Sequence, residues 1–171
     1  MDIRESTPED QQGILDVTIS AFGGTEEAQL IEALRENGDI VLSMVAVEYG
    51  EIVAHALFSD LKVVSNDGNT PIFAAALAPI SVAPTHQRLG IGSELIRQSL
   101  EKCEEIDIEA VFVLGEPKFY ARVGFNAEKA ECVKSAYSGP YFMVFETKKG
   151  VLHDFEGAAV YAEAFSGLEQ K

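Results

Sequence analysis

The sequence predicts a single α/β domain in which helices flank both faces of a mixed β-sheet. Its length of 171 residues is enough for one sizeable core. Its apolar fraction of 47% is that of an ordinary globular protein. Segments with strand and helix periodicity follow in the order β-α-α-β-β-β-α-β-α-β, which favours a mixed sheet. No linker or repeat interrupts this order, so the predicted domain spans residues 1–171.

A short strand and two helices are predicted at the N-terminal end. Residues 1–5 form the strand. Thr7 and Pro8 are typical of a helix start, with the hydroxyl as N-cap and the proline in the first turn. Gly23 and Gly24 end this helix, and Thr25 precedes a second helix that stops at residues 37–38. The inner face of the first helix is formed by residues at helical spacing: Ile14, Val17, Thr18, Ala21 and Phe22.

Three strands follow, at residues 40–47, 52–64 and 72–82. The third is the most apolar and is therefore predicted to be central. Pro79 cannot donate to a sheet ladder, so a bulge or a splayed strand is expected there. A glycine-containing turn then leads into an amphipathic helix over residues 91–106, a strand at 110–114, a short helix at 117–123 and a strand at 141–146. The tail, residues 151–165, is ambiguous between strand and helix.

Composition excludes several classes of function. The net charge is −15, from 28 acidic and 13 basic residues, which argues against nucleic acid or an anionic membrane as a partner. No apolar run is long enough to span a bilayer, and the first residues lack the features of a signal peptide. We therefore expect a cytoplasmic protein. Cys103 falls on a predicted core face, and neither it nor Cys132 has metal-ligand spacing with a histidine, so no metal site is predicted.

A candidate phosphate-binding turn, residues 87–92, lies between the third long strand and the amphipathic helix. The first turn of a helix has free backbone N–H groups and a partial positive charge. Gly90 and Gly92 allow a phosphate to approach the backbone, and Ser93 adds a hydroxyl. A plain strand-to-helix turn would look the same. A Walker turn is excluded because no Gly-Lys-Ser/Thr follows, and a Rossmann fingerprint would need three glycines after the first strand.

Two motifs together resemble those of the GNAT superfamily of N-acetyltransferases. Residues 82–92, Val-Ala-Pro-Thr-His-Gln-Arg-Leu-Gly-Ile-Gly, are similar to its acetyl-CoA signature. Residues 115–125, Gly-Glu-Pro-Lys-Phe-Tyr-Ala-Arg-Val-Gly-Phe, are similar to its Phe-Tyr-x-x-x-Gly-Phe element. The order of predicted elements also agrees, so the resemblance covers a core of about residues 1–146. The extension over residues 147–171 looks like the tail of the YhbS-like bacterial branch.

The resemblance implies the GNAT fold, with a splayed central pair of strands and acetyl-CoA as cosubstrate. Pantetheine would lie in the splay and pair with main-chain groups at the end of the third long strand. Tyr120 matches the tyrosine that protonates the departing sulfur in many members; the alternative is that it only packs beside Phe119. The implied cofactor-binding residues are Ile80, Ser81, Val82, Gln87, Arg88, Leu89, Gly90, Ile91, Gly92 and Ser93.

The general base is the part of the chemistry that the sequence leaves open. Members of the superfamily commonly use an acid on the central strand, and residues 73–82 contain none. Glu116 is the candidate, although an acid at a helix start also complements the helix dipole. His55 reads as a core histidine, and His86 lies beside the phosphate turn, where it is badly placed to act on an acceptor. His153 lies in the tail. Basic residues near the two motifs could meet coenzyme A phosphates: Arg88, Lys118 and Arg122.

The predicted reaction is transfer of acetyl from acetyl-CoA to a primary amine by direct attack in a ternary complex. The acceptor is a small-molecule or peptide amine. Residues 1–51 hold twelve acids and two bases, which favours a cationic acceptor, although a solubilising surface would look the same. A homodimer is compatible with the sequence. A catalytically silent acetyl-CoA-binding regulatory domain is the alternative, and an unrelated nucleotide-binding α/β domain is a third hypothesis.

Overall fold

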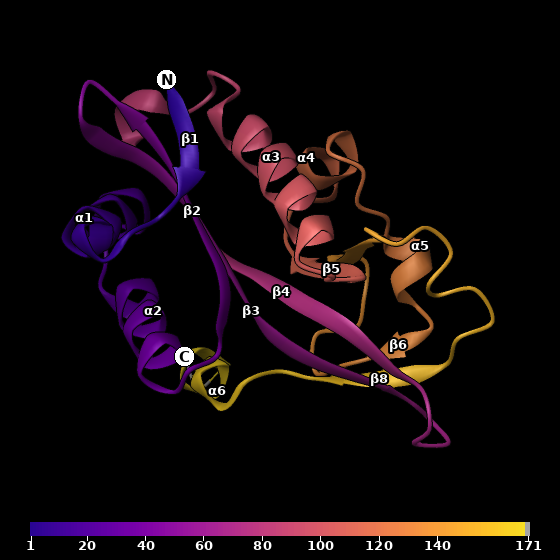
Figure 1. The fold of residues 1–171 in the computed structure, drawn as a ribbon. Coiled ribbons are helices and arrows are strands. Elements are labelled where there is room, and N and C mark those ends of the chain that lie inside the picture. The colour runs from indigo at the N-terminus through magenta and orange to yellow at the C-terminus, as the bar shows by residue number, and fades with distance from the viewer. Residues whose placement is uncertain (170–171) are drawn as a thin grey trace. The chain divides into compact units, whose positions relative to one another are not determined.

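The computed structural model describes residues 1–169, and Figure 1 shows its ribbon. The chain forms two compact units whose segments alternate along the sequence. The first unit contains residues 1–59, 78–99 and those from 162 onward, and the second contains residues 60–77 and 100–161. Three elements begin in one unit and end in the other: β3 (Glu51–Ser65), β4 (Pro71–Val82) and α3 (Ile91–Glu105). The single domain that the sequence predicts stays a prediction.

The first unit contains an antiparallel arrangement of β1 (Asp2–Glu5), β2 (Ile40–Glu48) and the start of β3. Ile3 pairs with Ala46, and Val45 pairs with His55. The helix predicted from Pro8 begins as a 3₁₀ turn, η1 (Pro8–Asp10), and continues as α1 (Gln11–Phe22). It packs against α2 (Glu26–Glu36), as Figure 1 shows. Gly23 ends α1 with φ +75°, a left-handed conformation that glycine adopts at little cost.

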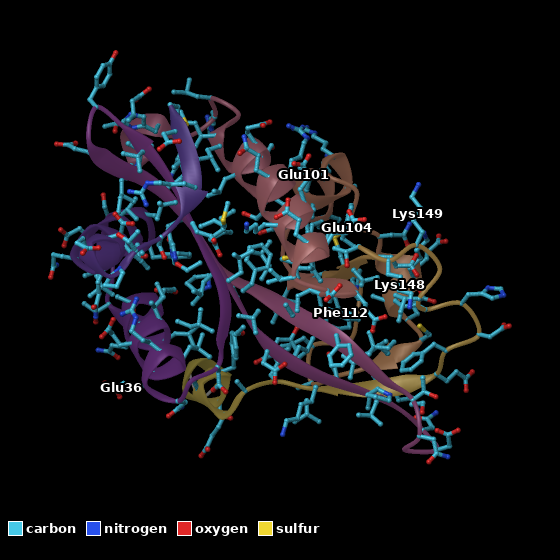
Figure 2. The ribbon with its side chains drawn as sticks, viewed as in Figure 1. Glu36, Glu101, Glu104, Phe112, Lys148 and Lys149 are labelled. Carbon is cyan, nitrogen blue, oxygen red and sulfur yellow. The ribbon has the colours of Figure 1, made fainter. Side chains whose placement is uncertain are left out.

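The second unit contains a parallel pair formed by β4 and β5 (Ala110–Leu114). Residues 74–76 of β4 run parallel to residues 110–112 of β5, and β5 pairs antiparallel with β7 (Phe142–Phe145). Phe112, which Figure 2 labels, stacks on Phe142 with ring centroids 5.3 Å apart. Both rings are essentially inaccessible to solvent, so this pair forms the centre of the unit's apolar core. Two short helices follow β5: α4 (Pro117–Arg122) and α5 (Ala127–Ala130).

The tail, which the sequence left ambiguous, contributes a strand. β8 (Gly157–Val160) pairs antiparallel with residues 62–65 of β3 and parallel with β6 (Val133–Lys134). A Cβ on Gly157 would lie 2.3 Å from the carbonyl oxygen of Val64, so only glycine permits this close approach. The chain then forms η3 (Glu163–Phe165) and α6 (Ser166–Glu169).

The predicted fold class is confirmed: the sheet is mixed, open and largely antiparallel, with β4 and β5 as its parallel central pair. The predicted strands and longer helices agree with the observed ones to within about three residues at each end; α5 and β6 were not predicted. Within residues 1–169, no helix is long and apolar enough to cross a membrane. Over the same residues, no group of three or more His, Cys, Asp or Glu side chains is placed to hold a metal ion.

Candidate functional site

The predicted phosphate turn lies in the first unit, between β4 and α3. A 3₁₀ turn, η2 (Pro84–His86), follows β4, and α3 begins at Ile91. Between them the backbone turns sharply, with φ +65° at Arg88 and φ +83° at Gly90. Glycine adopts such a conformation freely, whereas arginine is strained in it. The turn therefore contains one residue suited to its geometry, Gly90, and one that adopts it at a cost, Arg88.

The backbone amides of this turn are unpaired. In the part of the chain that the structure describes, the N–H groups from Gln87 to Ser93 have no hydrogen-bond acceptor, and the first helical bond is from Glu94 N to Gly90 O at 3.1 Å. A Cβ placed on Gly90 would meet no atom within 4 Å, so the space above the turn is open. Helix N-termini with free amides commonly bind anions in proteins, and α3 has fifteen residues.

The side chains of the turn have different surroundings. Gln87 folds back, and its Nε2 donates to the carbonyl oxygen of Val82 at 3.0 Å. Ile91 packs into the core, whereas Leu89 is 68% exposed. Arg88 is exposed and has no ion-pair partner in the described chain, so its charge remains available to an anion. Ile91 is one of the predicted cofactor-binding residues. Because its side chain is buried, only its backbone can contact a ligand.

The end of β4 also lies in the first unit. Ser81 is buried, and its hydroxyl donates to Thr18 Oγ1 on α1 at 3.3 Å, so its side chain faces the helix. Ile80 and Val82 are half-buried on the opposite face of the strand. Pro79 lies within β4, with a cis peptide bond before it. The predicted splay between β4 and β5 stays a prediction, because the strand ends concerned belong to different units.

Tyr120 lies in the second unit, on α4, within a cluster of aromatic rings. Its ring meets Phe119 edge-on at 4.9 Å and Phe125 edge-on at 5.6 Å. A Cβ on Gly115 would lie 2.3 Å from the Tyr120 ring, so the glycine makes room for it. Burial raises the pKa of the Tyr120 phenol to about 12. Its hydroxyl has no hydrogen-bond partner among residues 1–169, so the proton is free to be donated to a ligand.

Glu116 has a local structural contact. It is the N-cap of α4, and its carboxylate accepts from Lys118 N at 3.4 Å while remaining exposed. This is the helix-start arrangement that the sequence offered as the alternative to a catalytic role. Tyr120 and Glu116 thus share one short helix, but they lie in a different unit from the phosphate turn. That Tyr120 and Glu116 lie close to the turn stays a prediction.

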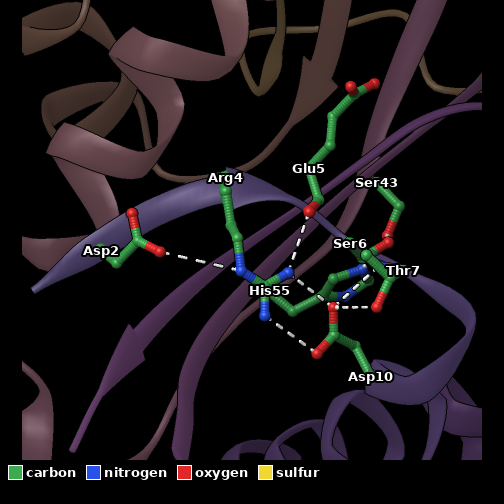
Figure 3. A network of polar contacts seen from close by, with 8 residues as sticks. All are labelled: Asp2, Arg4, Glu5, Ser6, Thr7, Asp10, Ser43 and His55. Carbon is green, nitrogen blue, oxygen red and sulfur yellow. Dashed lines mark hydrogen bonds and ion pairs between the residues drawn. The ribbon is translucent and has the colours of Figure 1, made fainter. Parts of the chain in front are cut away.

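The three histidines differ in their surroundings. His55 is fully buried, as a core histidine should be, and its Nε2 lies 2.9 Å from Ser43 Oγ (Figure 3). Among residues 1–169 its Nδ1 has no partner, and burial, followed by the charge of Arg35, lowers its pKa to about 3. His153 is exposed. His86 is only partly exposed, and it bonds through both ring nitrogens, to Thr85 and to Glu48.

Sequence reasoning did not identify three residues that support the candidate site. Thr18 receives the hydroxyl of Ser81, Glu48 binds the imidazole of His86, and Gly115 makes room for Tyr120. The first two contacts join residues 63 and 38 positions apart, so no local pattern could reveal them. Gly115 could have been found, because it immediately precedes the α4 motif and follows a buried strand.

Comparison with known proteins identifies a family that this chain resembles in sequence. The profile of the acetyltransferase (GNAT) domain matches residues 2–127. The N-acetyltransferase YhbS of Escherichia coli K12 is 28% identical over 96% of this chain and 98% of its own length. The N-acetyltransferase YjhQ of the same strain is 33% identical over 77% of this chain and 71% of its own.

Two solved structures resemble the fold over nearly the whole chain. The structure of Escherichia coli YhbS in complex with CoA has a TM-score of 0.87 and 27% identity, covering 96% of this chain and 91% of that one. A GNAT family acetyltransferase of Brucella melitensis in complex with acetyl-CoA has a TM-score of 0.77 and 29% identity, covering 96% of this chain and 97% of that one.

Proposed function

The chain belongs to the GNAT acetyltransferase family, and from that premise we propose that it transfers acetyl from acetyl-CoA directly to a primary amine bound at the same time. It is an acetyl-CoA-dependent acetyltransferase: its relatives are named N-acetyltransferases, and two similar structures hold CoA or acetyl-CoA. The observation that carries the proposal is the run of unpaired amides from Gln87 to Ser93 at the start of α3. Nothing favours the catalytically silent alternative.

The pyrophosphate of acetyl-CoA is assigned to this turn. Its amides would donate to phosphate oxygens, and the helix dipole would add a favourable field. Arg88, exposed and unpaired, supplies a charge that can bind a phosphate. Pantetheine would pair with the main chain from Ile80 to Val82. The hydroxyl of Ser81 would not take part, because it is already bound to Thr18.

Tyr120 is assigned the role of general acid toward the departing sulfur. A phenol whose pKa is about 12 keeps its proton at any physiological pH, so the donor is always present. It is also a weak acid compared with a thiol, whose pKa is near 8.5. Hydrogen-bond donation to the sulfur as negative charge develops there is therefore favoured over early, complete proton transfer.

Glu116 remains the proposed general base. Its carboxylate is exposed, so it can accept a proton from the amine through a water molecule while its other oxygen caps α4. The cap holds the carboxylate in a defined place beside the helix that carries Tyr120. A neutral glutamine keeps the capping oxygen and removes the basicity. Glu116→Gln should therefore lower kcat at neutral pH and leave the unfolding temperature unchanged.

A cationic amine is the acceptor that the charge of the first unit favours. The region of α1 and α2 carries seven acids against Arg35 alone: Glu9, Asp10, Asp16, Glu26, Glu27, Glu32 and Glu36. Asp10 is paired with Arg4 at 2.7 Å and Glu32 with Arg35 at 2.5 Å, which weakens the negative field there. Glu36, at the end of α2, points outward (Figure 2). The remaining field would concentrate a cation, although it would also raise the pKa of the amine.

The salt dependence of kcat/KM distinguishes acids that attract the acceptor from acids that only make the surface soluble. The Debye length, over which charges are screened, falls from about 30 Å at 0.01 M salt to a few Å near 0.5 M. If the field draws in the acceptor, kcat/KM for the best amine should fall over this range. A value of kcat/KM that does not change with salt, or an anionic best acceptor, would contradict the cationic assignment and leave the transferase assignment standing.

Calorimetry on Gly90→Glu tests the proposed site. A carboxylate above the free amides would repel a phosphate, and acetyl-CoA should bind at least about tenfold more weakly. Gly38→Glu is the matched control, because Gly38 has φ +73° and is equally open, so it adds the same strain and charge elsewhere. Equal binding by Gly90→Glu and wild type would show that the site is misplaced. A screen of acetyl-CoA consumption against amines, polyamines, amino acids and peptide N-termini would then identify the acceptor.

A further inference from the structure

A chain of side-chain hydrogen bonds ties the segment before the phosphate turn to the β2–β3 hairpin. The hydroxyl of Thr85 lies 2.9 Å from His86 Nδ1, and His86 Nε2 lies 2.9 Å from Glu48 Oε2. All three residues belong to the first unit. Glu48 is the last residue of β2, and the other two belong to η2, immediately before Gln87. The chain therefore joins segments 38 residues apart in the sequence.

Both nitrogens of the imidazole are satisfied when the ring is neutral. With the proton on Nε2, the ring donates to the carboxylate of Glu48, and Nδ1 accepts from the hydroxyl of Thr85. The His86 backbone N–H is also bound, to the carbonyl of Ala83 at 2.8 Å. The His86 side chain is 26% exposed and that of Glu48 is 32% exposed, so solvent only partly screens the bond. Because both of its nitrogens are bonded, the His86 ring has one orientation. This restrains the backbone of His86.

The hairpin that supplies Glu48 is a firm support. Tyr49 and Gly50 form its two-residue turn with φ +50° and +78°, the signs that a type I′ turn requires. Across that turn Glu48 pairs with Glu51 in the strand register. A few residues further along β3, the carbonyl of Val53 accepts from Ala83 N at 2.8 Å. The segment before the turn is thus attached to this hairpin at two points, one from the backbone and one from side chains.

The turn itself has few internal restraints. Its amides are unpaired, Arg88 adopts a positive φ, and the nearest side-chain bond is from Gln87 Nε2 to Val82 O at 3.0 Å. An anion site made of free amides binds well only if the amides already point at the ligand, since ordering them on binding costs affinity. The negative charge of Glu48 would disfavour an anion bound nearby. Its hydrogen bond to the His86 imidazole accounts for a carboxylate at this place.

We propose that His86 and Glu48 are positioning residues, which hold the phosphate turn in its anion-binding conformation by anchoring it to the β2–β3 hairpin. The inference rests on the proposed function, because it assigns the pyrophosphate of acetyl-CoA to the turn. The two residues act through the backbone of residues 87–93 and not by touching the thioester. Their loss should therefore affect only ligands that carry the pyrophosphate.

The experiment compares two acetyl donors. Acetyl-CoA carries the pyrophosphate, whereas acetyl-pantetheine has the same thioester and no phosphate. For His86→Ala and Glu48→Ala, the Kd of acetyl-CoA should rise about tenfold, equivalent to about 1.4 kcal/mol. The Kd of acetyl-pantetheine should not change. The double variant should lose no more than either single variant, because the two side chains act as one contact. Glu48→Gln keeps an acceptor oxygen and should lose less.

Glu51→Gln is the matched control. It removes the same charge from the same end of the hairpin, but Glu51 has no bond to His86, so its affinity for acetyl-CoA should equal that of wild type. Three results would overturn the proposal: equal losses for both donors, wild-type affinity in His86→Ala and Glu48→Ala, or a loss in Glu51→Gln as large as that in Glu48→Ala. Wild-type protein that does not bind acetyl-CoA would instead refute the proposed function itself.

Discussion

Both units of the molecule bury an apolar core, but the side-chain contacts that accompany it differ. In the first, hydrogen bonds join distant side chains: Arg4 with Asp10 (Figure 3), Ser6 with Ser43, Ser43 with His55, Ser81 with Thr18, and His86 with Glu48. In the second, aromatic rings pack in pairs: Phe112 with Phe142, Phe119 with Tyr120, Tyr120 with Phe125, and Phe125 with Phe145.

This difference corresponds to the group that each unit holds in place: the turn of free amides in the first and the Tyr120 phenol in the second. A turn of free amides needs its backbone fixed at a few points while its donors stay exposed, and directional hydrogen bonds between side chains do this. A phenol needs one fixed ring orientation with a free hydroxyl, and surrounding rings do this without using the hydroxyl. The comparison predicts that losing an aromatic ring is especially damaging in the second unit. In the first unit, the polar contacts should add a contribution to stability that depends on charge and pH.

The largest effect is expected from Phe142→Ala in the second unit. Phe142 is 1% exposed and stacks on Phe112, so its removal should leave a cavity and lower the free energy of unfolding by about 3–5 kcal/mol. Chemical denaturation measures this. Phe73→Ala is the control, since Phe73 is 67% exposed and should change stability by no more than about 0.5 kcal/mol. Equal losses in the two variants would contradict the role of aromatic packing.

The next effect is the acid sensitivity of the first unit at His55. Its pKa is lowered to about 3 in the folded chain, against about 6.5 when unfolded, so the unfolded chain binds a proton that the folded chain does not. Stability is therefore complete above pH 6.5 and falls with decreasing pH, by up to about 1.4 kcal/mol per pH unit. Unfolding measured between pH 6.5 and 5 should show this slope. His55→Gln should flatten it, and an unchanged slope would rule out His55 as the cause.

Tyr120→Phe isolates chemistry from packing in the second unit. The ring and its contacts with Phe119 and Phe125 remain, and only the proton donor is lost. General acid catalysis is worth about 10²–10⁴-fold, so kcat should fall at least about tenfold while acetyl-CoA affinity stays nearly unchanged. Because the pKa of Tyr120 is about 12, the ratio of wild-type to variant kcat should be constant from pH 7 to 9. Equal kcat values, with chemistry shown to limit the rate, would exclude the role.

A smaller effect is expected from Asp10→Asn in the first unit. Asp10 accepts two bonds from Arg4, at 2.7 and 3.1 Å, and these bonds lower its pKa to about 2. Since Arg4 is 38% exposed, screening limits the expected loss of stability at pH 7 to about 1 kcal/mol. The contribution is present above pH 4 and is lost as pH falls toward 2. Thermal unfolding measures it, with Asp16→Asn as the control for removing an exposed acid.

The smallest effect is expected from Lys148→Ala, which removes an ion pair in the second unit. Lys148 Nζ lies 3.2 Å from Glu109, but the lysine is 69% exposed, so the loss should be below about 0.5 kcal/mol. The comparison with Asp10→Asn is direct, because each pair links separate segments of its own unit. If Lys148→Ala were the more damaging of the two, the contrast between the polar contacts of the first unit and the aromatic packing of the second would fail.

Most elements were predictable because their signals are local. Gly23 with its positive φ ends α1, the Ser65–Gly68 turn separates β3 from β4, and an amphipathic face marks α3. The weakest predictions concern short elements. α5 has four residues and β6 has two, so neither has enough periodicity to be detected, and β8 becomes a strand only because β3 and β6 offer pairing partners.

The sequence by itself determined the fold class, the glycine-containing turn before α3 and the position of Tyr120 on α4, because spacing, capping and turn residues act between near neighbours in the chain. Tertiary structure alone decided that Ser81 faces α1, that His86 is bound to Glu48 and that Tyr120 is buried with a free hydroxyl. These facts depend on contacts between residues far apart in the chain. Burial and partner choice arise only when such segments pack, and they decide which polar groups remain free to bind a ligand.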